Sequence, residues 1–418
     1  MTGALPATVT ARRRSTGSCL GPLPVVNLVL LEIGLAIGLA LLAVDTALWW
    51  AALGVLLVAV PLALGRWRGR WLLWWVQLTA RYLARSHRPR VLTMASLGPV
   101  APGHPPASEV LGSDHPQVAL LRLVVPDLIV AHGADHQREP LGLAWHQGTW
   151  TAVLRVQAAP SLITPVGSTP NLPLGALAPC LEDRGVVLDA IQVIWHCYPG
   201  NAALPSSSPA LRSYLEVLGP LPAAARRTTW VVVRLDPRRC LAAVAERGGA
   251  VMGAHRALIG ALARVRSALE THGVSTRPLD ADQLLRAGIS AAELSAVAGT
   301  GQQVALSEGW TAVTAAGVGH ASYAISGWQV GGVAPNLTAL TGIRALSTTV
   351  ALSVSPGGVG TEVGLRGLVR VSARNHAELE AADGRLQAVS ERLGVTLTPL
   401  HGLQTAGLAA TLPLGVSG

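Results

Sequence analysis

One cluster of His and Asp residues has the spacing of a metal site. His132 and His136 are four residues apart, with Asp135 between them. Two imidazoles at this spacing bind zinc when they share one face of a helix. The segment 131–139 (AHGADHQRE) lacks a helical pattern, so we expect a solvated loop here and no metal site.

His196 and Cys197 have the side chains of a thiol–imidazole pair. Such a pair forms a nucleophile and its base when the two groups face each other. The two residues end a segment that reads as a buried strand, and adjacent residues of a strand face opposite sides. We therefore expect no catalysis at this position.

Asp280 and Asp282 are the third candidate, because two close carboxylates can hold a metal ion. In some glycosyltransferases such a pair binds the metal of a sugar nucleotide. The other interpretation is a helix N-terminus, where acidic side chains favour the positive end of the dipole. A membrane-anchored glycosyltransferase-like enzyme that uses these two residues is the alternative function.

The sequence contains no Lys, so all 32 basic residues are Arg. A P-loop, a kinase site and a pyridoxal phosphate site each require a Lys. The protein therefore lacks the groups for these chemistries, and another chain must hydrolyse any nucleotide that the process consumes. We expect no catalytic residues, no cofactor, no metal and no bound nucleotide.

Two apolar segments near the N-terminus are long enough to cross a bilayer. Val25–Val44 is interrupted only by Asn27 and Glu32, and Ala47–Leu64 carries no charge. A transmembrane helix needs about 20 residues, with about 17 as the lower limit. We predict two transmembrane helices, at about 25–44 and 47–64, within residues 24–65.

The distribution of Arg predicts the orientation of these helices. Arg12–Arg14 precede the first helix and three Arg follow the second between residues 66 and 70, whereas the loop between the helices carries only Asp45. Cytoplasmic loops carry the excess of positive charge. We therefore expect a two-pass protein of the cell inner (plasma) membrane with both termini in the cytoplasm, residues 1–23 forming a cytosolic segment.

Three residues of the first helix are candidates for transmembrane packing. Gly34 and Gly38 form a small-xxx-small face, which lets another helix approach closely. The partner is either the second helix of the same chain or another subunit. Glu32 is a carboxylate in an apolar run, about two turns from the inner face, where it can snorkel or bind an Arg.

Aromatic and Arg side chains are predicted to anchor the helices at the two membrane interfaces. Trp49 and Trp50 lie at the outer one. Residues 66–97 form an Arg/Trp-rich segment that we interpret as an interfacial helix contacting anionic lipid. Its anchors are Arg66, Trp67, Arg68, Arg70, Trp71, Trp74 and Trp75.

The net charge of +9 comes mostly from this region, because residues 1–90 hold ten Arg and only two acidic residues. A nucleic-acid-binding domain carries its positive charge on the folded domain itself. The rest of this chain is nearly neutral, so nucleic acid is excluded as a partner.

A Pro/Gly/Ser-rich linker at residues 98–117 leads to a domain at 118–418. Strand-like and helix-like segments alternate there without a repeat period, which predicts a mixed α/β cytosolic domain behind the transmembrane hairpin. The clearest segments are predicted strands at 118–125, 228–235 and 348–355, a hairpin at 141–156, and helices at 249–272 and 375–393.

The order of these parts resembles the EccE family of the type VII (ESX) secretion systems of mycobacteria. The resemblance rests on the early helix pair, the exit segment 66–90, the hairpin GLAWHQGTWTAVL at 142–154 and the ending HGLQTAGLAATLPLG at 401–415.

Such a resemblance implies a membrane subunit similar to an outer brace of the secretion complex, with EccB, EccC and EccD-like partners. In that family EccC is the ATPase, and EccE supplies no catalytic residues. We therefore expect a non-catalytic structural subunit of a type VII inner-membrane complex that supports protein export. A lipid-binding regulatory adaptor is a third interpretation.

Overall fold

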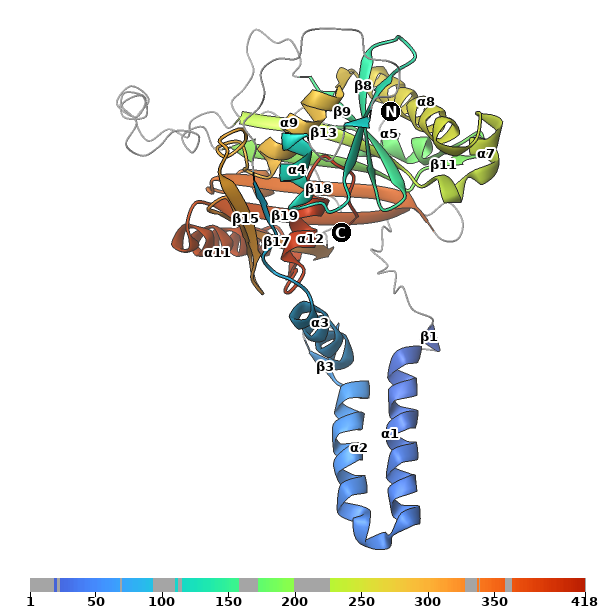
Figure 1. Cartoon of the computed structure of the whole chain (residues 1–418), viewed down its shortest axis with the longest axis vertical. Coiled ribbons are helices and arrows are strands. Elements are labelled where there is room, and N and C mark those ends of the chain that lie inside the picture. The colour runs from blue at the N-terminus through green and yellow to red at the C-terminus, as the bar shows by residue number, and fades with distance from the viewer. Residues whose placement is uncertain are drawn as a thin grey trace. The chain divides into compact units, whose positions relative to one another are not determined.

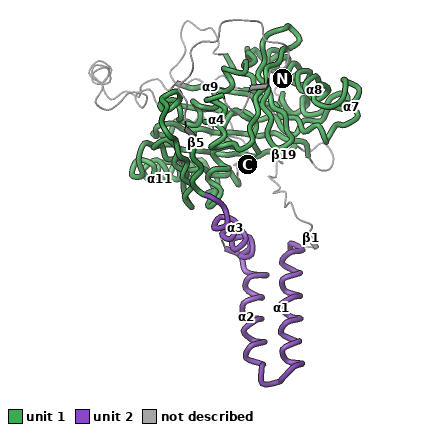
Figure 2. Tube along the Cα trace, viewed as in Figure 1, with its two compact units in different colours: residues 1–11, 87–418 green, residues 12–86 purple. Residues whose placement is uncertain are grey.

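The computed structural model describes two compact units, residues 12–86 and residues 87–418 (Figure 2). Within them, the described residues are 19–20, 23–67, 70–92, 110–111, 115–157, 172–198, 226–327, 337, 339–357 and 363–417.

The smaller unit is a helical hairpin. Helix α1 (Val25–Val44) and helix α2 (Trp49–Leu64) are joined by Asp45 and the short 3-10 helix η1 (Thr46–Leu48). The Asp45 carboxylate accepts a hydrogen bond of 2.9 Å from the Ala47 N–H, which shapes the turn. The segments 25–44 and 46–64 have mean hydropathies of 2.4 and 2.3, so both are long and apolar enough to cross a membrane.

Small residues lie where the two helices meet. Gly34 and Gly38 are buried against α2, and a Cβ added at Gly34 would lie 2.5 Å from the Cβ of Ala59. The Asn27 side chain donates a 2.7 Å hydrogen bond to the carbonyl of Ala63. The small-xxx-small face of α1 therefore packs on α2 of the same chain.

A short β-ribbon and a third helix follow the hairpin. Strand β3 (Arg66–Trp67) pairs with strand β4 (Arg70–Trp71), and helix α3 (Leu72–Ala84) begins directly afterwards. A helix thus lies in the predicted Arg/Trp-rich segment, but it is 13 residues long, shorter than the segment 66–97, and its position at a membrane interface stays a prediction.

The larger unit is built on one sheet of 14 strands, all of whose described pairings are antiparallel (Figure 1). The strands are β5 (Arg90–Leu92), β6 (Val110–Leu111), β7 (Ile129–Ala134), β8 (Pro140–His146), β9 (Thr149–Val156), β12 (Ala190–Tyr198), β13 (Arg226–Leu235), β14 (Thr276–Pro278), β15 (Gln303–Glu308), β16 (Val313–Ala315), β17 (Val318–Gly327), β18 (Ser347–Pro356), β19 (Val363–Ala373) and β20 (Thr396–Pro399).

Helices cover both faces of this sheet, which makes three layers. One face packs on α5 (Leu174–Leu177), η2 (Ala178–Leu181), α7 (Leu241–Glu246), α8 (Ala250–Thr271) and α11 (His376–Arg392). The other packs on α4 (Pro116–Arg122), α9 (Ala281–Ala291) and α12 (Gln404–Ala410). In β13, Val231 and Val233 enter the first core, whereas Trp230 and Val232 enter the second, as strand alternation requires.

The starts of helices α11 and α4 test two of the sequence predictions. Asn375 caps α11 by accepting a 2.8 Å hydrogen bond from the Glu378 N–H, which confirms the predicted helix start. The predicted strand at 118–125 is wrong, because Pro116 opens helix α4 there. Proline at the first helical position is a start signal that outweighs the β-branched run behind it.

The sheet contains a repeated arrangement of strands. Inside the edge strands β6 and β5, the order toward the centre is β7-β8-β9-β13-β12 in the first half and β15-β16-β17-β19-β18 in the second, and β12 pairs with β18 at the centre. Each half then adds a helix, a short strand and a second helix: α8, β14 and α9 in the first, α11, β20 and α12 in the second. We call these halves the first and second repeats.

The register of the strands supports the same equivalence. Pro278 of β14 lies opposite Leu154, and the N–H of the next residue, Leu279, donates a 3.0 Å hydrogen bond to the Val153 carbonyl. In the second repeat Pro399 of β20 lies opposite Tyr323, and Leu400 N–H donates 3.0 Å to the Ser322 carbonyl. Both segments carry the pattern G-V-x-x-x-P-L-x-x-x-Q, at 273–283 and 394–404.

The sequence shows no repeat period, and the structural repeat was therefore not predicted. The repeat has no fixed period because the connecting segments differ in length between the halves. The first repeat inserts η3 (Pro237–Arg239), α7 and the first turn of α8 between β13 and the part of α8 equivalent to α11. In the second repeat α11 begins three residues after β19 ends.

Two glycines test the packing of β8 on α9. A Cβ at Gly142 would lie 2.8 Å from backbone atoms of Ala281, whereas Gly384 in α11 has nothing within 4 Å of a Cβ. We expect Gly142→Ala to destabilise the protein by about 1–3 kcal/mol and Gly384→Ala to stabilise it by about 0.5–1 kcal/mol. Denaturant unfolding followed by Trp fluorescence measures both, and equal effects would contradict the close approach of Gly142 to α9.

Candidate functional site

The predicted metal-like cluster is spread over strand β7 and the turn that follows it. His132 lies within β7, so the predicted loop is wrong for this residue. The Asp135 carboxylate accepts hydrogen bonds from the backbone N–H groups of Gln137 and Glu139, at 2.8 and 2.9 Å. Among the described residues no group of three His, Cys, Asp or Glu side chains is arranged to hold a metal ion.

Asp280 and Asp282 lie at the start of helix α9. The Asp280 carboxylate accepts a 2.7 Å hydrogen bond from the Gln283 N–H, and the Asp280 N–H donates one to the Gln283 side-chain oxygen, which forms a capping box. Asp282 occupies the first turn, where the helix dipole favours a negative charge. Both residues thus have a structural explanation as a helix start, which leaves the glycosyltransferase interpretation without support.

His196 and Cys197 face opposite sides of β12, as the sequence predicts. Cys197 accepts a 3.1 Å hydrogen bond from the Arg227 guanidinium, and burial raises the pKa of its thiol. The His196 imidazole instead accepts or donates a 2.8 Å hydrogen bond with the Thr349 hydroxyl of β18. His196 thereby joins a buried polar cluster that the sequence analysis did not predict.

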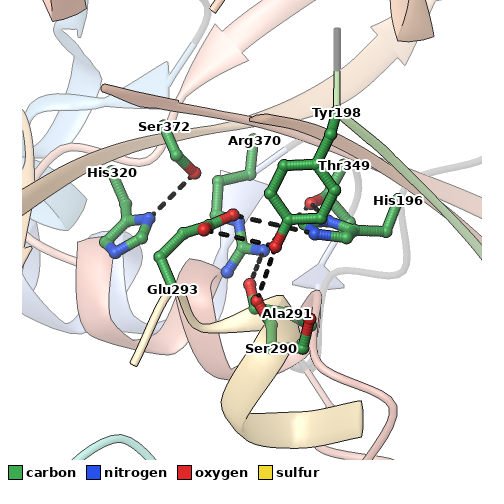
Figure 3. A network of polar contacts seen from close by, with 9 residues as sticks. All are labelled: His196, Tyr198, Ser290, Ala291, Glu293, His320, Thr349, Arg370 and Ser372. Carbon is green, nitrogen blue, oxygen red and sulfur yellow. Dashed lines mark hydrogen bonds and ion pairs between the residues drawn. The ribbon is translucent and has the colours of Figure 1, made fainter. Parts of the chain in front are cut away.

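This polar cluster lies beneath the centre of the sheet, on the face covered by α9 (Figure 3). Its charged members are Arg370 of β19, fully buried, and Glu293, which follows α9. Arg370 Nη2 donates a 2.9 Å hydrogen bond to the Thr349 hydroxyl. The same nitrogen also donates a hydrogen bond to the Ala291 carbonyl at the end of α9.

Tyr198 and His320 complete the cluster (Figure 3). The Tyr198 hydroxyl lies 3.0 Å from the Ser290 carbonyl and 3.2 Å from a Glu293 carboxylate oxygen. His320 forms a 2.9 Å hydrogen bond with the Ser372 hydroxyl. Since β12, β17, β18 and β19 all contribute, the cluster assembles only when both repeats are paired.

Glu293 is held in an unusual backbone conformation. Its φ is +59°, in the left-handed region that usually follows a helix end with glycine. The Leu294 N–H donates 3.0 Å to the Ile289 carbonyl, so the turn itself is an ordinary helix stop. A carboxylate at this position is directed under the sheet, where burial raises its pKa.

Burial dominates the protonation of the cluster. It lowers the pKa of His196 to about 3, with the Arg370 charge acting in the same direction. It also lowers the pKa of His320, and it lowers that of Arg370 to about 10 against the opposing effect of Glu293. At neutral pH both imidazoles are therefore neutral and Arg370 is charged.

The hydroxyl–imidazole pair of Ser372 and His320 resembles a nucleophile and its base in type. Both side chains are 0% exposed, so in this structure neither is accessible to a substrate. The cluster is thus arranged to hold the end of α9 against β18 and β19.

A sequence signal for this cluster exists in retrospect. Arg370 interrupts the apolar run Leu368-Val369-Arg370-Val371 at a position that alternation assigns to the sheet interior. Glu293 gives no such signal, because only the fold shows that the residue after α9 turns inward.

The predicted interface anchors form ring contacts within the smaller unit. The guanidinium of Arg66 lies 4.0 Å from the ring centroid of Trp71, and that of Arg70 lies 4.0 Å from that of Trp74. Trp75 donates a 3.2 Å hydrogen bond to the Trp67 carbonyl. These cation–π contacts fix the direction of two positive charges.

Three further anchor and packing candidates are exposed within the smaller unit. Trp49 and Trp50 are exposed with ring centroids 3.6 Å apart, and Glu32 is exposed on α1. Arg68 lies outside the described residues.

The depressed histidine pKa values predict sensitivity to acid. His196 has a pKa of about 3 when folded and 6.5 when unfolded, so stability is full above pH 6.5 and falls as pH drops toward 3. Each such histidine contributes a loss of about 1.4 kcal/mol per pH unit once the pH is well below its unfolded pKa. His320 acts in the same direction, and the raised pKa of Glu293 offsets part of the loss.

We expect His196→Asn to reduce the drop in unfolding temperature between pH 7 and pH 5, at some loss of stability at pH 7. His376→Asn on α11 is the matched control, because the side chain of His376 is 80% exposed. Thermal unfolding of the detergent-purified protein checks this, and an unchanged acid dependence in His196→Asn would contradict a buried neutral imidazole.

Comparison with known proteins identifies the relatives of this chain. Residues 223–325, from just before β13 to β17, match a family model described as "Putative type VII ESX secretion system translocon, EccE". The matched segment covers the strongest predicted strand, the insertion with α7 and α8, and all of α9.

Curated proteins of mycobacteria match over wider regions. The ESX-1 secretion system protein EccE1 of Mycobacterium tuberculosis is 27% identical over 230 residues, 55% of this chain and 43% of that protein. The ESX-5 secretion system protein EccE5 of Mycobacterium marinum is 28% identical over 163 residues, 36% of this chain and 40% of that protein.

The chain thus spans less than half the length of these curated relatives, with 43% and 40% of their residues covered. The matches agree with the order of parts seen in the sequence, and they come from two different ESX systems. Over these regions the chain is similar to the EccE proteins of type VII ESX secretion systems.

Proposed function

We propose that this protein is a non-catalytic structural subunit of a type VII secretion complex in the inner membrane and supports protein export. The observation that carries the proposal is the match to EccE proteins named as ESX secretion-system components. Two features of the chain agree with it: the apolar hairpin, and the absence of Lys that excludes a P-loop of its own.

In this proposal the hairpin spans the membrane and both termini are cytoplasmic. Glu32 then lies near the inner interface, and the guanidinium groups of Arg66 and Arg70 meet the phosphates of anionic lipid. Their stacking on Trp71 and Trp74 supports this role, because it holds each charge beside an aromatic ring suited to the headgroup layer.

The hairpin also offers a surface for other membrane subunits. An apolar groove of about 530 Å³ runs between α1 and α2, and a Cβ at Gly54 on its wall would meet nothing within 4 Å. A helix from an EccB, EccC or EccD-like partner can approach the α2 backbone closely at such a glycine.

The larger unit exposes few large apolar side chains. Among its described residues these are Leu241, Val251, Met252 and Val363. The first three lie in the insertion of the first repeat, which has no counterpart in the second. Exposed apolar side chains on a segment that the repeat does not need favour a protein-contact surface.

The proposal predicts that the hairpin is needed for assembly. Deleting residues 25–64 should release the rest of the protein from the membrane and abolish co-purification with EccB, EccC and EccD-like subunits. Mass spectrometry of the tagged complex from mild detergent measures this. In a control, an unrelated two-helix hairpin replaces residues 25–64, and full recovery of the complex with it would contradict direct packing by α1 and α2.

The insertion predicts a second effect on assembly. Leu241→Ser combined with Met252→Ser should reduce the recovery of partner subunits at least several-fold. The unfolding temperature should stay the same, because Leu241 is 67% exposed and Met252 is 50% exposed. Val363→Ser, at 37% exposure outside the insertion, is the control. Equal recovery for both variants would show that the insertion is not a contact surface.

A further inference from the structure

The polar cluster joins the two repeats. The end of α9, in the first repeat, is held by Arg370 of the second repeat through the Ala291 carbonyl. Tyr198 of the first repeat binds the neighbouring Ser290 carbonyl at 3.0 Å. The cluster therefore fixes a helix of one repeat on strands of the other.

Comparison of the two repeats shows whether the fold requires the positive charge of Arg370. Arg370 lies opposite Ser322, and the equivalent pair in the first repeat is Val232 opposite Val153. Val232 is fully buried and apolar. The same strand position is thus compatible with a plain hydrophobic side chain.

The equivalent helix end is also held without a charge. At the end of α12, the Ala410 carbonyl accepts a 2.8 Å hydrogen bond from the Gln192 side chain of β12. By strand register Gln192 is the counterpart of Thr349. A neutral amide therefore suffices for α12, whereas α9 uses a buried guanidinium, whose burial is costly.

Several polar atoms of the cluster have no hydrogen-bond partner among the described residues. They are Arg370 Nε and Nη1, His196 Nε2 and Glu293 Oε1. His196 Nε2 and Glu293 Oε1 are 3.7 Å apart, which is too long for a hydrogen bond. Buried donors and acceptors of this kind are normally paired, with protein or with ordered water.

The protons of the cluster can be assigned from its geometry. The Thr349 hydroxyl accepts from Arg370 at 2.9 Å and so has its own proton to donate to His196 Nδ1 at 2.8 Å. His196 Nε2 then carries a hydrogen. Four N–H groups, three on Arg370 and one on His196, therefore need an acceptor, and Glu293 Oε1 needs a donor.

We propose that ordered water binds in this cluster and bridges Arg370, His196 and Glu293. Water both accepts and donates, which matches the mixed set of unpaired atoms. Arg370 and Glu293 carry opposite charges, so a neutral molecule adds no net charge to the interior, whereas a bound anion or cation does. The water site draws on β12 of the first repeat and on β18 and β19 of the second, and it holds the end of α9 against these strands.

The direct test is a structure of the full-length protein at a resolution that shows ordered water elsewhere in its core. We expect density within hydrogen-bonding distance of Arg370 Nε and Glu293 Oε1. A dry cluster in such a map would overturn the proposal. So would density replaced by bromide after exchange of the buffer anion, because the occupant would then be an anion.

Variants give a second, independent measurement. Arg370→Val, which copies Val232, and Glu293→Leu each leave an uncompensated buried charge, so each alone should lower the unfolding temperature by about 10 °C. The double variant removes both charges and should recover most of this loss. Additive effects would mean that the two charges are not coupled through the bridge and would refute it.

Discussion

The pairing of β12 with β18 is the interaction on which the larger unit depends. It runs from Ile191 opposite Val354 to Cys197 opposite Thr348, and it joins the repeats into one continuous sheet. Ile194 lies opposite Ala351, and strand register makes these two residues equivalent. An approximate two-fold axis therefore passes through this pair, and each repeat supplies half of the two cores on either face of the sheet.

The polar cluster shows that the two repeats differ in their buried side chains although their strands have the same order. The strand positions at His196, His320 and Arg370 correspond to Ser353, Thr151 and Val232 in the other repeat, by register. Thus only the second repeat carries a guanidinium at the strand position shared by Arg370 and Val232. Since a hydrophobic residue occupies the equivalent site, the cluster distinguishes α9 from α12 rather than supporting the sheet in general.

Sequence patterns gave the local elements of this fold well but gave little about its assembly. The run TTWVVVRL at 228–235 and the capped helix after Asn375 were predictable, because their signals are local. Helix α4 was not, since a short apolar run is compatible with helix and strand alike, and only Pro116 argues for a helix.

The repeats and the polar cluster were missed for a different reason. Differences in connecting length, above all the insertion that contains α7, remove any constant period from the sequence. The cluster draws on residues 196–372, from four strands and a helix end, and no short pattern relates positions so far apart. Family resemblance was recognisable earlier than either, because it rests on the order of whole segments.

The central pairing also has a consequence for biosynthesis. When β12 and β13 have left the ribosome, the free edge of β12 presents Ile191, Val193 and other buried residues with no neighbouring strand. Elongation at about 5–20 residues per second brings β18 out roughly 6–24 s later. During that interval the nascent first repeat has an open, apolar sheet edge, which makes it a substrate for chaperones until the second repeat closes it.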